Sequence, residues 1–250
     1  NDNANYCKCD NCAASDAKYG APSGTLLAFV NRIAEVIGKK YPDVLVHTFA
    51  YDYTVEAPDG ITAGDNVFVQ ICNIFECQSH SLTDPCNEES YAEFKKWSDI
   101  AKQVGVWDYP GNWACHYIPN PIYTYDNLHG LYSNFADLNP ILYYSNSYMG
   151  NISGEFAEMR YHLAGRFMWD PYFTEDEYND YVESFIKAYY GPGYKEILDT
   201  IALMQEKTAT VHVEYANVYH SSPSGMFGMY FYRVIDELIA GMNSARLKTV

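Results

Sequence analysis

The chain has few basic residues and no long apolar run. Its 250 residues include 16 Lys and Arg against 32 Asp and Glu, which gives a formal net charge of -16. A charge balance of this sign repels phosphate backbones, and so it argues against nucleic-acid binding. No run of about 18 apolar residues occurs, so we expect no membrane-spanning helix. The first five residues are polar and do not read as a signal peptide, although a processed, exported chain would look the same.

Two sequence signatures of large enzyme classes are also missing. No glycine-rich phosphate loop of the P-loop or dinucleotide-binding type is present. No Gly-x-Ser-x-Gly elbow occurs either, which argues against a serine hydrolase. We therefore expect no organic cofactor.

Cysteine is absent from the second half of the chain, and all seven cysteines lie between positions 7 and 115. Cys7, Cys9 and Cys12 are close enough in sequence to bind one structural zinc ion. A fourth ligand would come from Cys77, Cys86 or His80. Two alternatives remain open: disulfides, for example between Cys77 and Cys86, in an exported protein, and reduced thiols.

The first part of the chain alternates strand and helix patterns. Apolar stretches predict strands at residues 44–51, 66–72, 104–109 and 140–144, and apolar residues at helical spacing predict helices near 23–40, 91–101 and 127–135. Alternation of this kind indicates parallel βα units. The loops that follow such strands build the functional site in barrels and open sheets.

From residue 153 onward the pattern becomes helical. Phe156, Met159, Leu163 and Phe167 form one apolar stripe. Thr174 and Glu177 have the spacing of a capping box, which predicts a helix beginning after Thr174. Further helices are expected near 194–207 and 227–247. We therefore predict two regions, residues 1–152 and residues 153–250.

Aromatic residues make up 16% of the chain, with 25 Tyr, 12 Phe and 4 Trp. The most informative group is Trp107-Asp108-Tyr109, which places a carboxylate between two rings where a strand is expected to end. Flat rings suit the apolar face of a sugar, and a carboxylate suits the chemistry of a glycosidic bond. Strand-end acids are also often structural, as loop caps or partners of Arg.

Several motifs, in order along the chain, resemble the DUF4838 family. They are residues 1–12 (NDNANYCKCDNC), 27–31 (LAFVN), 41–44 (YPDV), 50–54 (AYDYT), 65–67 (DNV), 76–80 (ECQSH), 107–109 (WDY) and 189–191 (YYG). The family comprises bacterial glycoside hydrolase-like proteins similar to α-glucuronidases and hexosaminidases. The ordered set of motifs covers most of the chain and is more specific than any one of them.

The resemblance implies a (β/α)8 TIM-barrel-type α/β fold with a carbohydrate site at the carboxyl ends of its strands. In that frame the chain supplies the C-terminal half of the barrel, about four parallel βα units, followed by a helical C-terminal region. The expected partners are a polysaccharide or oligosaccharide, together with the N-terminal half of the barrel or a second copy of the chain. The expected location is extracellular or periplasmic, at a bacterial cell surface.

Glycoside hydrolysis requires two carboxylates across the scissile bond, one of them held protonated by burial. Our first candidate is Asp108. The second is Asp2, because related barrels place their acid after the fourth strand, and the third is Glu76. The candidates for sugar binding are Tyr51, His80, Trp107, Tyr109, Trp113 and Tyr148.

The sequence departs from the family at the end of its last strand. The family tends to have a Glu-Gln-Gly-like segment there, whereas residues 144–148 read YSNSY. If that Glu is required for catalysis, the chain binds a sugar without cleaving it. The alternatives to a hydrolase are therefore a non-catalytic carbohydrate-binding protein and a structural surface protein, both derived from such a barrel.

Overall fold

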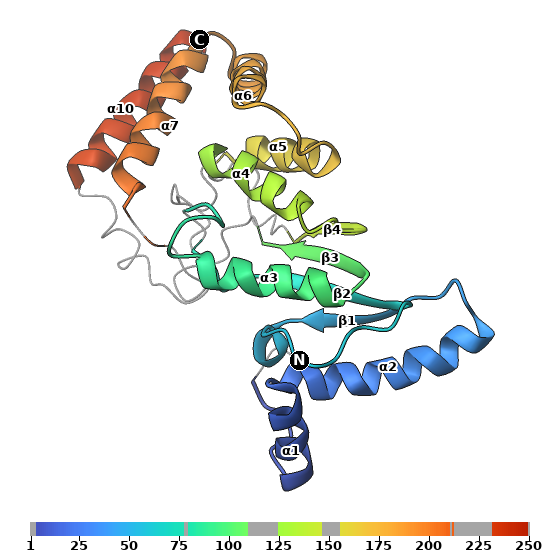
Figure 1. Cartoon of the computed structure of the whole chain (residues 1–250). Coiled ribbons are helices and arrows are strands. Elements are labelled where there is room, and N and C mark those ends of the chain that lie inside the picture. The colour runs from blue at the N-terminus through green and yellow to red at the C-terminus, as the bar shows by residue number, and fades with distance from the viewer. Residues whose placement is uncertain are drawn as a thin grey trace. The chain divides into compact units, whose positions relative to one another are not determined.

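A computed structural model describes residues 4–77, 80–109, 125–146, 156–210, 212 and 232–249 (Figure 1). These residues divide into two compact units. The first consists of residues 1–74, 88–109 and 134–145, and the second of residues 75–87, 110–133 and 146–250. No helix in the described ranges is both long and apolar enough to cross a membrane.

The first unit contains one parallel sheet of four strands in the order β1-β2-β3-β4. The strands are β1 (Val46–Ala50), β2 (Val67–Asn73), β3 (Gln103–Asp108) and β4 (Leu142–Ser145). Each expected strand is confirmed, with ends shifted by one or two residues. An α/β protein with parallel βα units is therefore the correct class.

Three helices alternate with the strands, as predicted. They are α2 (Pro22–Lys40), α3 (Glu88–Ile100) and α4 (Tyr125–Ala136), and a short 3-10 helix η1 (Asp52–Thr54) follows β1. A further helix, α1 (Asp10–Tyr19), was not expected. It buries none of its residues, so it lacks the apolar stripe by which a helix is found in a sequence.

The sheet has one face packed against helices. Phe135 of α4 makes an edge-to-face contact with Tyr143 of β4, and Phe94 of α3 packs against Phe135. Tyr143 pairs in register with Val106, which is buried. Because side chains alternate along a strand, Val106 and Tyr143 identify the helix-covered face, and their immediate neighbours point to the opposite face.

The second unit is mainly helical. Its helices are α5 (Ala157–Trp169), α6 (Glu175–Tyr190), α7 (Tyr194–Thr208) and α10 (Tyr232–Thr249), with the 3-10 helix η2 (Gly191–Gly193) between α6 and α7. The predicted capping box is confirmed, since the Thr174 hydroxyl accepts from the Glu177 N–H and the Glu177 carboxylate accepts from the Thr174 N–H. The boundary predicted after residue 152 stays a prediction.

Helices α7 and α10 run side by side (Figure 1), and two glycines, one in η2 and one in α10, leave room for close contacts between them. A Cβ atom at Gly193 would lie 2.5 Å from the backbone oxygen of Ala245, and one at Gly241 would lie 2.4 Å from the Thr200 hydroxyl. Gly193 has a φ of -86°, so its backbone would accept any residue. Glycine is therefore required at position 193 because there is no room for a Cβ atom, and not because of its backbone conformation.

We expect Gly193→Ala to destabilise the protein by about 1–3 kcal/mol, because the added methyl group meets backbone atoms that cannot rotate away. Chemical denaturation followed by circular dichroism measures this loss. The matched control is Gly165→Ala in α5, where a Cβ atom meets nothing within 4 Å. This control should leave stability unchanged or raise it by up to about 1 kcal/mol. Equal effects of the two substitutions would contradict the close helix approach.

Candidate functional site

A buried polar pair lies where β2 and β3 end. Asn73 and Asp108 are the last residues of these strands and pair in register. The Asn73 amide donates a hydrogen bond to Asp108 Oδ1 over 3.1 Å. The Asp108 side chain is 0% exposed and Asn73 is 1% exposed. The carboxylate predicted as the leading catalytic candidate therefore lies at the carboxyl edge of the sheet, as expected, and is fully enclosed there.

Asp108 and Trp107 point to opposite faces of the sheet. Asp108 shares the helix-covered face with Val106, two residues before it, whereas Trp107 points the other way. The Trp107 ring lies 5.5 Å from the ring of Phe49 on β1 and 4.4 Å from that of Tyr144 on β4. These two side chains are neighbours in sequence, but they lie on opposite faces of the sheet.

The rings around Trp107 form a group that we call the aromatic row: Phe49, Trp107, Tyr109 and Tyr144. The Tyr109 ring lies 6.2 Å from Trp107 and is itself buried. Phe49 and Tyr144 are 38% and 44% exposed. The row therefore offers open ring faces on the side of the sheet opposite the helices, near its carboxyl ends.

Tyr51 and Glu76 are two further predicted site residues that the structure describes. Tyr51 follows β1, and its backbone carbonyl accepts a hydrogen bond from the Thr54 hydroxyl over 2.8 Å. Glu76 belongs to the second unit and is 3% exposed. Asp2, Trp113 and Tyr148 lie outside the described residues.

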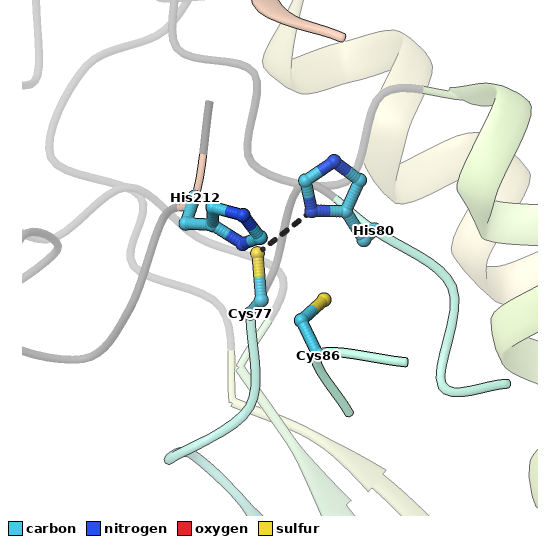
Figure 2. Close-up of side chains that lie close together, drawn as sticks. All are labelled: Cys77, His80, Cys86 and His212. Atoms are coloured by element: carbon cyan, nitrogen blue, oxygen red, sulfur yellow. Dashed lines mark hydrogen bonds between the residues drawn. The ribbon is translucent and has the colours of Figure 1, made fainter. Parts of the chain in front are cut away.

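Four potential metal ligands converge in the second unit: Cys77, His80, Cys86 and His212 (Figure 2). Their ligand atoms all lie within 4.8 Å of one another. Three of them, Cys77, His80 and Cys86, are the residues that the sequence offers as a fourth ligand for the N-terminal cysteines. We call the group of four the Cys–His cluster. No sequence pattern points to His212, which follows α7, far along the chain from the other three.

Two hydrogen bonds orient His80 within this cluster. Its Nδ1 lies 3.2 Å from Cys77 Sγ, and its Nε2 lies 3.0 Å from the carbonyl oxygen of Ala209. A carbonyl only accepts, so Nε2 carries the hydrogen. In the neutral ring Nδ1 is then the acceptor of a hydrogen bond from the Cys77 thiol. Burial lowers the pKa of His80, but the bonds to Ala209 and Cys77 outweigh it and leave the pKa above its ordinary value.

The buried Asn87 amide fixes the loop that carries Cys77 and His80. Asn87 Oδ1 accepts from the Cys77 N–H over 2.7 Å. Its Nδ2 donates to the carbonyls of Cys77 and Ser81, each over 2.9 Å, and to that of His80 over 3.3 Å. The Asn87 side chain, next to Cys86 in sequence, thus holds the backbone of both Cys77 and His80.

The N-terminal cysteines form a second cluster. The sulfur atoms of Cys7, Cys9 and Cys12 lie within 4.8 Å of one another, at the start of α1. Among the described residues, no histidine, cysteine or acid completes this triplet to four ligands. No disulfide joins any of the six cysteines that the structure describes. A structural zinc at this triplet stays one of the alternatives that the sequence leaves open.

The thiols of Cys9 and Cys12 differ in acidity. The backbone N–H of Cys12, followed by hydrogen bonds from the Cys7 and Cys12 side chains, lowers the pKa of Cys9 to about 7. Side-chain hydrogen bonds with Cys7 first and then with Cys9 raise the pKa of Cys12 to about 11. Cys9 therefore carries more thiolate than Cys12 near neutral pH.

We expect iodoacetamide to alkylate Cys9 at least about tenfold faster than Cys12 near neutral pH, because the thiolate is the nucleophile. The Cys9 rate should fall as pH drops below about 7, where its thiolate is protonated. Peptide mass spectrometry of samples quenched early, with a chelator present, measures both rates. Cys86, whose pKa burial and the nearby Cys77 raise to about 11, serves as an internal control. Faster labelling of Cys12 or Cys86 would contradict this order.

Comparison with known proteins yields one family. No curated protein matches the sequence significantly. The profile of the family described as "Domain of unknown function (DUF4838)" matches residues 1–200, four fifths of the chain. This span includes the whole parallel sheet, the Asn73–Asp108 pair, the aromatic row and three of the four residues of the Cys–His cluster. The chain therefore belongs to the DUF4838 family.

Proposed function

We propose that this protein binds a glycan along the aromatic row and hydrolyses it with paired carboxylates. The observation that carries the proposal is the set of open ring faces at the carboxyl ends of adjoining parallel strands. Phe49 and Tyr144 flank Trp107 there, and both are well exposed. Aromatic rings present large, rigid apolar faces of the kind that stack on the apolar side of a sugar ring.

The proposed chemistry uses Asp108 and a second acid. Asp108 is enclosed at the strand ends, and burial of this kind can keep a carboxyl group protonated, as a general acid requires. From the sequence, the candidates for the second carboxylate are Asp2 and Glu76. A polymeric glycan as substrate would suit a protein that acts outside the cytoplasm.

We also propose that the four strands are part of a (β/α)8 barrel. The sheet has two edge strands, β1 and β4, and apolar residues near both edges are well exposed: Val44, Leu45, Ile141 and Leu142. In a closed barrel such edges pair with further strands, and the face opposite the helices lines the interior. Strands from the N-terminal half of a barrel, or from a second copy, would cover these residues.

A second candidate function is carbohydrate binding without hydrolysis. The specific observation in its favour is the position of Asp108, which is hydrogen-bonded to Asn73 on the helix-covered face. A sugar stacked on Trp107 would lie on the other side of the sheet from this carboxylate. In that case Asp108 would join two strand ends, and the aromatic row alone would contact the ligand.

We expect Tyr144→Ala and Phe49→Ala each to weaken oligosaccharide binding by about fivefold, the equivalent of about 1 kcal/mol for one stacked ring. Isothermal titration calorimetry against a ligand found by glycan-array screening measures the loss. Tyr172→Ala is the matched control, because Tyr172 is 76% exposed and belongs to the second unit, whereas the row belongs to the first. An equal loss in all three variants would show that the row does not hold the sugar.

We expect Asp108→Asn to abolish hydrolysis and leave glycan binding within about twofold, since the amide keeps the shape of the side chain but cannot transfer the proton. Reducing-sugar release from a glycan panel, together with binding to the same glycans, separates the two effects. Hydrolysis that survives in Asp108→Asn would exclude Asp108 as the acid. A wild-type protein that binds a glycan but releases no sugar would establish the second candidate function.

A further inference from the structure

We propose that Cys77, His80, Cys86 and His212 bind one zinc ion in a closed tetrahedral site. Two thiolates and two imidazoles are a ligand set that zinc takes in structural sites of proteins. The site would join the segment that follows β2 to the segment that follows α7. It is independent of the proposed carbohydrate function, because all four ligands belong to the second unit and none belongs to the aromatic row.

The distances are close to those that a zinc ion requires. Bonds of about 2.0 Å to nitrogen and about 2.3 Å to sulfur place tetrahedral ligand atoms roughly 3.3–3.8 Å apart. The Cys77 sulfur and His80 Nδ1 are 3.2 Å apart, and all four ligand atoms fall within 4.8 Å (Figure 2). Small side-chain rotations therefore suffice to bring the four atoms to one ion.

His80 has the orientation that a metal ligand needs. Its Nε2–H donates to the Ala209 carbonyl, which leaves the lone pair of Nδ1 facing the cluster. Imidazoles that bind metals commonly donate their other N–H to a backbone carbonyl or a carboxylate, and this bond fixes the ring and its tautomer. This carbonyl belongs to Ala209, which lies close to His212 in sequence. The hydrogen bond therefore holds the part of the chain that carries the fourth ligand near His80.

Asn87 supplies the rigid support behind the ligands. Its amide satisfies the backbone of Cys77 on both the N–H and the carbonyl side, and it reaches the carbonyls of His80 and Ser81. Asp84 closes the same loop, because its carboxylate accepts from the Ser81 N–H over 2.9 Å. A loop held in this way presents two ligands in a fixed geometry before any ion binds, as a selective site requires.

A disulfide between Cys77 and Cys86 is the main competitor for these sulfurs. It would use the two thiols but would give no role to the two imidazoles, whose rings lie 4.8 Å apart beside them. Zinc uses all four side chains. Because the protein would fill all four coordination positions, no position remains for a reactive water, and the ion would act as a cross-link rather than as a catalyst.

The test is zinc binding by the full 250-residue chain, purified with a reductant and stripped with a chelator. We expect one equivalent of zinc by elemental analysis after addition of zinc chloride and gel filtration. Cobalt in its place should give the visible absorption of a tetrahedral thiolate site. Zinc should raise the unfolding temperature by roughly 5 °C or more. A wild-type chain that takes up no zinc overturns the proposal.

Cys86→Ser and His212→Asn identify the ligands. Both residues are exposed, so the folded state should survive, as circular dichroism would check. Each change should lower zinc affinity by at least about 100-fold in a chelator competition. The matched control replaces Cys7, Cys9 and Cys12 together by Ser and should keep the full equivalent of zinc. Zinc that persists in Cys86→Ser and His212→Asn, or that is lost in the triple variant, overturns the assignment.

Asn87→Asp tests the support behind the ligands. The carboxylate keeps the acceptor for the Cys77 N–H but loses both hydrogens donated to the loop carbonyls. We expect zinc affinity to fall by about 10–100-fold while one equivalent still binds. Peptide mapping without reduction completes the test. Recovery of a Cys77–Cys86 disulfide from folded protein incubated with zinc overturns the proposal in favour of the covalent link.

Discussion

The in-register parallel pairing of β2 with β3 is the constraint on which the first unit depends. It sets Asn73 beside Asp108 and Cys72 beside Trp107, so it decides which side chains meet at the strand ends. Because side chains alternate along a strand, a slip of one residue would move Asp108 to the open face and Trp107 under the helices. The apolar residues of the helix-covered face, Val104 and Val106, hold the register against such a slip.

A separate constraint organises the second unit, and it is polar rather than apolar. The Asn87 amide is 1% exposed and makes four hydrogen bonds to the loop backbone of residues 77–81. Buried amides of this kind are costly unless fully bonded, so each of these contacts is required once Asn87 is enclosed. Asn87, which is not a ligand in the proposed zinc site, therefore fixes the backbone of Cys77 and His80.

The sequence predicted the features that depend on local pattern. Every strand of the sheet and the helix after Thr174 follow from apolar spacing or from a capping box. It could not predict α1, whose residues are all at least partly exposed, nor the Cys–His cluster, because His212 meets the other three ligands only through the fold. The sequence motif also groups Trp107 with Asp108, because the two residues are adjacent in the chain. In a strand, adjacent side chains point to opposite faces of the sheet.

The opposite orientation of Trp107 and Asp108 bears directly on how a sugar could be used. Rings on the open face can hold a ligand without any change in the sheet, because Phe49 and Tyr144 are already exposed. The Asp108 carboxylate can reach a ligand only past the carboxyl edge, where it is bonded to Asn73. Glycan binding therefore needs only the exposed rings, whereas hydrolysis also needs the ligand to reach the enclosed Asp108 carboxylate. A hydrolytic reaction would have to take place over the ends of β2 and β3, where both faces of the sheet meet.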